Sequence, residues 1–189
     1  MPIYIIEHLE PKLWTWSQIE YKHIGKLVGK AQCWITNIKG TNTALQKCAK
    51  LIPKSVTTLN LSKVCVLDPE APTLLTTVDA KTFDYFVFGG ILGDHQPQKR
   101  TKKELTQHFP HRVQSRNIGK IQMSTDNAVA VVHEIVRGTS FSTLQFKDEI
   151  EIPLAKNESV IFPYRYLILN GKPLVSVELI EYLKRTQNF

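Results

Sequence analysis

Cysteines and long hydrophobic runs are scarce in this chain of 189 residues, and their scarcity excludes several classes of protein. The three cysteines, Cys33, Cys48 and Cys65, form no C-x-x-C pair, which argues against a disulfide framework and a thiolate metal site. They favour a reducing, cytoplasmic setting. The first residues, MPIYIIEHLEP, turn acidic too soon for a signal peptide, and no later run has transmembrane length, so we expect no membrane partner.

Several motifs of catalytic and binding sites are missing as well. The six histidines include no H-E-x-x-H spacing, and we therefore expect no metal. Neither a G-x-S-x-G elbow nor a Cys-His signature supports nucleophilic catalysis. The glycine motif GGILGD lacks the Lys-Ser/Thr pair of a P-loop and does not match G-x-G-x-x-G, so a phosphate site is unsupported.

The chain is basic, with a formal net charge of +7, which favours anionic partners such as nucleic acid or a ribosome. One local source is the run Lys99, Arg100, Lys102 and Lys103, which is either a solvated face or a contact for ribosomal RNA. The 42% hydrophobic and 22% charged residues are ordinary for a globular protein. The length suits a single domain over residues 1–189.

Strand and helix signals alternate along most of the chain. Strands are predicted over residues 2–6, 32–36, 63–67, 83–88 and 113–117. Helices are predicted over residues 11–28, 42–51 and 102–108, and from a cap at Ser124 or Thr125 to Gly138. Extended segments at 146–154 and 159–169, a turn at 170–171 and a helix over 176–184 follow. This alternation predicts an α/β fold, with a mostly parallel sheet, helices on both faces and ligands at the carboxyl ends of the strands.

A carboxylate interrupts the apolar stripe of the first predicted helix. At 3.6 residues per turn, Leu13, Trp16, Ile24 and Leu27 share one face, and Glu20 projects from the middle of it. Glu20 is either paired with a basic partner or part of a pocket, because buried carboxylates are rarely left unpaired. Three further acids stand near predicted strand ends, and together with Glu20 they suggest an acidic pocket for a cationic substrate group: Glu7, Glu10 and Asp94.

Two loops combine a strand end with features of a ligand site. The stretch FVFGGILGDH places adjacent glycines directly after a buried strand, which fits a tight turn or close approach by a ligand. The stretch RNIGKIQMSTDNAVAV joins another predicted strand end to a capped helix, which fits an ordinary helix start or a second ligand loop.

Four blocks of sequence carry a family resemblance: EHLEP with WSQIEY, then FVFGGILGDH, then RNIGKIQMSTDNAV, then FPYRYLILNGKP. In this order they resemble the small SPOUT-class methyltransferases of archaea and eukaryotes. Among these, they are most similar to the SPOUT-type protein arginine methyltransferases that act on a small-subunit ribosomal protein. The blocks extend over most of the chain, although residues 38–82 add little to the resemblance.

The resemblance implies an α/β knot, in which the parallel sheet continues into a C-terminal deep trefoil knot over about residues 84–189. The knot would hold S-adenosylmethionine in a bent shape, largely through main-chain groups. By position, the implied cofactor-binding residues are Phe88, Gly89, Gly90, Ile91, Leu92, Gly93, Asp94, Asn117, Ile118, Gly119, Ile121, Gln122, Met123, Ser124, Thr125 and Ala128.

The resemblance also implies transfer of a methyl group to an arginine side chain of a small-subunit ribosomal protein. An arginine acceptor is cationic, so carboxylates must orient it and a proton must leave during or after the transfer. The candidate catalytic residues are four acids, Glu7, Glu10, Glu20 and Asp94, with His95 and Tyr164 as lesser candidates for handling the proton.

RNA is the alternative substrate, because most SPOUT members methylate rRNA or tRNA. An RNA methyltransferase would more naturally use aromatic stacking and a basic pocket floor. The acidic residues favour a protein acceptor. A cofactor-binding or ribosome-assembly factor without catalysis is a third class, disfavoured because both cofactor loops are intact. The sequence marks neither a monomer nor a homodimer.

Overall fold

A parallel sheet of six strands forms the centre of the protein, in a computed structural model that describes residues 1–92, 100–110, 113–155 and 158–186. The strands lie in the order β3-β2-β1-β5-β4-β6, and each pair of neighbours is parallel. Their bounds are Ile3–His8 (β1), Cys33–Thr36 (β2), Lys50–Ile52 (β3), Val64–Leu67 (β4), Tyr85–Gly90 (β5) and Gln114–Arg116 (β6). The mostly parallel sheet predicted from the sequence is confirmed.

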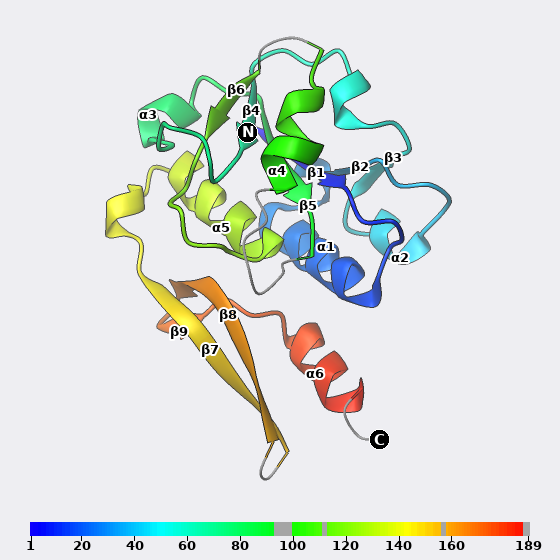
Figure 1. The fold of residues 1–189 in the computed structure, drawn as a ribbon, viewed down its shortest axis with the longest axis vertical. Coiled ribbons are helices and arrows are strands. Elements are labelled where there is room, and N and C mark those ends of the chain that lie inside the picture. The colour runs from blue at the N-terminus through cyan, green and yellow to red at the C-terminus, as the bar shows by residue number, and fades with distance from the viewer. Residues whose placement is uncertain (93–99, 111–112, 156–157, 187–189) are drawn as a thin grey trace.

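Apolar clusters cover both faces of this sheet (Figure 1). The helices α1 (Thr15–Val28) and α5 (Thr125–Val136) contact each other and pack on the face that carries Tyr4 and Phe86. On the opposite face, Ile5 and Val87 pack with Leu105, which directly follows α4 (Arg100–Glu104). The shorter helices are α2 (Thr43–Gln46), α3 (Thr77–Ala80) and the 3-10 turns Lys30–Gln32, Val56–Thr58, Thr106–His108 and Phe141–Thr143.

The C-terminal part forms a second, antiparallel sheet of three strands. It consists of β7 (Phe146–Ala155), β8 (Glu158–Leu169) and β9 (Lys172–Pro173), followed by α6 (Val177–Thr186). In Figure 1 the hairpin of β7 and β8 extends away from the main sheet, and α6 packs against β7. Ile19 of α1 joins Phe162 and Leu179 in a separate apolar cluster there. The sequence predicts the extended segments and the last helix, but not their assembly into a sheet of their own.

Three sequence predictions of helices are wrong in their bounds. The one over residues 102–108 is α4, which ends at Glu104, followed by the separate 3-10 turn Thr106–His108, because Leu105 leaves the helical conformation. The helix predicted over residues 42–51 is a single turn that Asn42 caps at its start, by accepting a hydrogen bond from the Leu45 N–H, and that ends at Gln46. The chain then extends into β3, where Leu51 pairs with Ile35 of β2. The first helix starts at Thr15 rather than at residue 11, although it ends at Val28 as predicted.

Gly25 tests how tightly α1 packs on the segment before β3. A Cβ on Gly25 would overlap the backbone carbonyl oxygen of Cys48 and lie 2.8 Å from the Cys48 Cβ. Alanine normally stabilises a helix by about 1 kcal/mol relative to glycine. We expect Gly25→Ala instead to lower the free energy of unfolding by about 1–3 kcal/mol, because the overlap cannot relax without moving backbone. Urea denaturation measures this change.

The control is Lys26→Ala, one residue further along the same helix at an exposed position. It should change the free energy of unfolding by less than about 0.5 kcal/mol. A Gly25→Ala variant as stable as the parent protein would contradict the packing described for α1.

Candidate functional site

A cavity of about 420 Å³ lies at the carboxyl ends of β4 and β5. Its walls come from α1, α4, the two strand ends, the loop before α5 together with the start of α5, and β8. Both the size of this cavity and its position at the edge of a parallel sheet are typical of sites for small-molecule ligands.

The two glycines at the end of β5 have different surroundings. Gly89 lies on the cavity wall, whereas Gly90 does not. A Cβ on Gly90 would overlap the Tyr21 hydroxyl and lie 2.9 Å from Ile6 Cγ2, so this glycine is needed for packing between β5, β1 and α1. Three other residues implied to bind the cofactor line the same wall: Phe88, Ile91 and Leu92.

The loop before α5 forms the facing wall. Gly119 adopts a φ of 90°, a conformation that residues with a Cβ rarely adopt. Asn117 does not line the cavity but holds the loop: its amide donates to Ala71 O at 2.8 Å, and its side-chain oxygen accepts from Gly119 N at 3.0 Å. The implied cofactor-binding residues of this segment that line the cavity are Ile118, Gly119, Ile121, Gln122, Met123, Ser124, Thr125 and Ala128.

Glu20 brings a buried carboxylate to the cavity, as the apolar stripe of the first helix predicts. Glu20 is 6% exposed, and Trp16 Nε1 donates a hydrogen bond to Glu20 Oε1 at 2.9 Å. Burial, reinforced by the negative charge of Asp126, raises the pKa of Glu20 to about 8, although hydrogen bonds from Trp16 and Thr125 oppose the rise. Glu20 is therefore mostly protonated near neutral pH until a cation arrives.

The structure brings neither Glu7 nor Glu10 to the cavity wall. Glu7 Oε2 accepts hydrogen bonds from Thr36 Oγ1 at 2.5 Å and from Val56 N at 2.9 Å, which ties β1 to the neighbouring strand and turn. Glu10 Oε1 accepts from Leu92 N at 3.1 Å and from Arg100 Nη1 at 2.9 Å. Glu10 therefore supports the wall from behind.

The other candidate catalytic residues divide into two groups. Tyr164 of β8 lines the cavity together with Trp16 and Glu20, so the outer hairpin contributes to a site formed mainly by the parallel sheet. Gly93, Asp94 and His95 lie outside the described residues.

Several lining residues were not among the sequence candidates. Trp16 was interpreted as part of the apolar stripe, and Arg100 as part of a basic run, yet both line the cavity. Asp68 and Glu70 also line it, and the rule that ligands bind at strand ends could have singled them out, because they follow β4. In the parts of the chain that the structure describes, no cluster of His, Cys, Asp and Glu could hold a metal ion.

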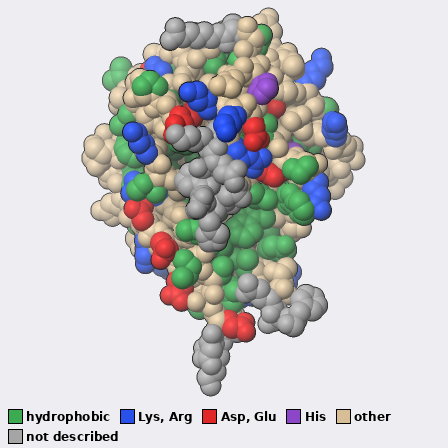
Figure 2. Space-filling model, in the orientation of Figure 1, with side chains coloured by type: hydrophobic (Ala, Val, Ile, Leu, Met, Phe, Trp, Pro, Cys, Tyr) green, Lys and Arg blue, Asp and Glu red, His purple; other side chains and the backbone are tan. Residues whose placement is uncertain are grey.

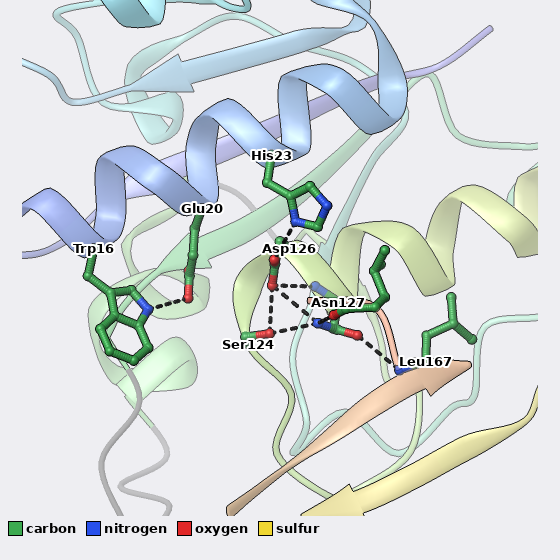
Figure 3. Close-up of polar contacts among 8 residues, drawn as sticks. Trp16, Glu20, His23, Ser124, Asp126, Asn127 and Leu167 are labelled. Carbon is green, nitrogen blue, oxygen red and sulfur yellow. Dashed lines mark hydrogen bonds and ion pairs between the residues drawn. The ribbon is translucent and has the colours of Figure 1, made fainter. Parts of the chain in front are cut away.

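A chain of polar contacts lies behind Glu20 and connects α1, α5 and the outer hairpin (Figure 3). His23 Nδ1 and Asp126 Oδ2 are 2.7 Å apart, and Ser124 Oγ donates to Asp126 Oδ1 at 2.6 Å. Asn127 Nδ2 donates to Ser124 Oγ, and Asn127 Oδ1 accepts from Leu167 N at 2.9 Å. The start of α5 is thereby fixed against both α1 and β8.

The fold is the one found in the SPOUT class of methyltransferases. The fold is similar to that of the dual-specific Trm10 from Thermococcus kodakaraensis, with a TM-score of 0.57 over 75% of this chain and 95% of that chain, at 15% identity. The crystal structure of the yeast arginine methyltransferase SFM1 with SAM is much more similar, with a TM-score of 0.89 over 100% of this chain and 92% of that chain, at 33% identity.

Sequence comparison narrows the class to one family. The chain is 34% identical over 201 residues to the protein arginine N-methyltransferase SFM1 of Saccharomyces cerevisiae, a match that covers 96% of this chain and 94% of the yeast protein. The model of the family described as "Protein arginine N-methyltransferase SFM1-like" matches residues 3–188. The chain belongs to this family, as the resemblance of the four sequence blocks indicates.

The raised pKa of Glu20 predicts how stability changes with pH. The folded state retains the Glu20 proton up to about pH 8, whereas an unfolded glutamate loses it near pH 4.5. Between these values the unfolded state is the one that loses the proton, so the free energy of unfolding falls as pH rises. Glutamine carries no such cost and can still accept from Trp16. Because one pKa unit corresponds to about 1.4 kcal/mol, we expect Glu20→Gln to gain about 2 kcal/mol or more relative to the parent protein between pH 5 and pH 9.

Urea denaturation of both proteins across this pH range checks the expectation. Parallel stability curves for the two proteins would show that Glu20 is not held in its protonated form.

Proposed function

We propose that the protein transfers a methyl group from S-adenosylmethionine to an arginine side chain of a small-subunit ribosomal protein. The observation that carries the proposal is the buried carboxylate of Glu20, which lies with Trp16 and Tyr164 on the wall of a cavity that also contains Gly89 and Gly119. Membership of the SFM1-like family supports the arginine acceptor. The resemblance of the sequence blocks and the net charge of +7 support a ribosomal substrate.

The cavity fits the cofactor. Apolar side chains such as Phe88, Ile118 and Met123 offer a surface for the adenine ring, and Gly89 contributes to the same wall. Solved structures of the yeast relative contain SAM and SAH. When bound, the cofactor supplies an electrophilic methyl group on a positively charged sulfur. The other cofactor-binding residues inferred from the sequence remain part of the proposal, including Gly93 and Asp94, which lie outside the described residues.

Glu20 has the properties needed to hold the acceptor. A guanidinium keeps its proton at neutral pH, so it needs an opposite charge for orientation and a base for the proton that leaves. An entering guanidinium favours the ionised form of Glu20, because an opposite charge lowers the pKa of a carboxyl group. The indole of Trp16 fixes Glu20 Oε1 and presents an aromatic surface to the cation. Burial of the pair in a cavity aligns nitrogen and methyl group, which is the main requirement of this transfer.

The remaining catalytic candidates take supporting places in the proposal. Glu10 orders the wall through Leu92 and Arg100, and Glu7 acts through the position of β1. Tyr164 contributes a phenol at the cavity wall. Asp94 and His95 remain candidates for contact with the acceptor, on the sequence argument alone.

Contact with ribosomal RNA would involve the exposed lysines of α4. Lys102 and Lys103 are exposed, whereas Arg100 is engaged by Glu10 at 2.9 Å and by Glu104 at 2.7 Å; Lys99 lies outside the described residues. In Figure 2, Lys and Arg side chains, mixed with acidic ones, occupy the upper part of the face shown, and hydrophobic side chains gather in its lower part. The lysines therefore offer charge for a phosphate backbone beside the cavity.

The organisation of the chain completes the proposal. We retain a single methyltransferase domain over residues 1–189, with the knot over about 84–189, acting in the cytoplasm as a monomer or homodimer. Among the described residues, no helix has the combination of length and apolar character that crossing a membrane requires.

Filling the cavity should weaken cofactor binding. Ala128 lies on the first turns of α5 and lines the cavity, so Ala128→Leu would place three additional carbon atoms in the space assigned to the cofactor. We expect the dissociation constant for S-adenosylmethionine, measured by calorimetry, to rise at least about tenfold, which corresponds to about 1.4 kcal/mol. The matched control is Ala44→Leu on the exposed surface of α2, outside the cavity. Equal affinity in both variants would place the cofactor elsewhere.

A transfer experiment with methyl-labelled cofactor tests the acceptor. We expect the label in an arginine of a small-subunit ribosomal protein, and Glu20→Gln to reduce kcat/KM by about 100-fold, because general-base and orienting groups typically contribute this much. Total RNA is incubated in parallel. Label in RNA alone would refute the protein acceptor in favour of an RNA methyltransferase, and full turnover by Glu20→Gln would refute the role of Glu20.

A further inference from the structure

A buried contact between His23 and Asp126 lies next to Glu20 and takes no part in the proposed chemistry. His23 Nδ1 lies 2.7 Å from Asp126 Oδ2, and the two side chains are 14% and 5% exposed. Glu20 and His23 are three residues apart on α1, so they project from the same side of the helix. Figure 3 shows Glu20, His23 and Asp126 grouped between α1 and the start of α5.

The charge of Asp126 is held in a fixed position. Asp126 Oδ1 accepts hydrogen bonds from Ser124 Oγ at 2.6 Å and from Asn127 N at 2.8 Å, while Oδ2 faces His23. These contacts prevent the carboxylate from turning away from α1. The preceding residue, Thr125, lines the cavity together with Glu20, and Figure 3 places Asp126 beside Glu20.

Two opposed effects on Glu20 follow from this geometry. The fixed negative charge of Asp126, in a poorly solvated site, disfavours ionisation of Glu20 beside it. A positively charged His23 that donates Nδ1–H to Asp126 offsets part of this opposition. The direction of the Asp126 effect is visible in two neighbours, because after burial itself Asp126 is the largest cause of the raised pKa of both Glu20 and Tyr166.

We propose that His23 and Asp126 are a positioning pair for Glu20, and that their charges set the pH range in which Glu20 becomes the anion that holds an arginine acceptor. The link to arginine rests on the proposed function. The control of Glu20 ionisation does not, because it depends only on the ion pair itself. An ordinary structural account of Asp126 would assign it to the positive end of the α5 dipole, where an acidic residue stabilises a helix start.

The other titratable groups around the pair come from the elements packed on α1. β8 contributes Tyr164 and Tyr166, and α1 itself contributes Tyr21. From α6, Glu178 pairs with Lys22 at 2.6 Å, so the two charges next to His23 largely compensate each other. Four further charged residues line the same cavity as Glu20, namely Asp68, Glu70, Arg100 and Lys120, and Asp126 is the carboxylate beside Glu20 at the start of α5.

The test measures the ionisation of Glu20 directly, without enzymatic activity. Carbon-13 labelling of glutamate carboxyl groups gives one NMR titration curve per glutamate, and Glu20→Gln identifies the Glu20 signal by its loss. Asp126→Asn keeps a hydrogen-bond partner for Ser124 and His23 but removes the charge. We expect Asp126→Asn to lower the midpoint of the Glu20 titration by about one pH unit, and His23→Gln to raise it by about half a unit.

Lys22→Gln is the matched control, because it also removes a positive charge from an ion pair of α1, one position from His23. It should leave the Glu20 midpoint within about 0.2 units, since the side chains of Lys22 and Glu178 are 27% and 37% exposed and solvent screens their charges. Unchanged midpoints in both Asp126→Asn and His23→Gln, or shifts in the same direction, would overturn the proposal. If Asp126→Asn fails to fold, the result from His23→Gln alone decides.

Activity separates this inference from the proposed function. The acid limb of the kcat/KM profile for arginine methylation should move with the NMR midpoint in each variant. Opposed NMR shifts in a protein that methylates no arginine would leave the positioning pair intact and refute the function. Arginine methylation with an unshifted profile and unshifted NMR midpoints would leave the function intact and refute the positioning pair.

Discussion

The side-chain amide of Asn127 is the interaction on which the geometry of the site depends. This residue is fully buried, and its amide group bonds to Ser124 in the cofactor loop, to Leu167 N of β8 and to Leu174 O. A buried amide left unpaired is costly, so these contacts form together or not at all. These contacts fix the orientation of the antiparallel hairpin relative to the parallel sheet. Tyr164 of the hairpin therefore lines a cavity whose other walls come from distant parts of the sequence.

The parts of the fold and the site that could be predicted are those with a local physical cause. The buried strands and the cap at the start of α5 follow from neighbouring residues, and the inward direction of Glu20 follows from helical periodicity alone. The parallel sheet follows from the alternation of these elements. The positions of both glycine loops at strand ends follow from the same alternation, and Gly89 and Gly119 both line the cavity.

Long-range contacts account for what the sequence did not reveal. Glu7 resembles a free acid at a strand end, yet Thr36 and the Val56 amide occupy its carboxylate, and neither partner is near it in the sequence. The segment of β3 has helical periodicity but gains more from pairing with β2. The sequence does not distinguish Gly90 from Gly89. In the structure the hydroxyl of Tyr21 occupies the space that a Cβ on Gly90 would need. In each case the deciding neighbour is brought in by the tertiary fold.

The hairpin of β7 and β8 also contacts the loop before α5 through main-chain atoms. Arg165 N of β8 donates to Gln122 O in the loop before α5 at 2.8 Å, and this one contact does not depend on side-chain identity. Substitutions along the outer faces of β7 and β8 can therefore accumulate without disturbing the walls formed by the parallel sheet.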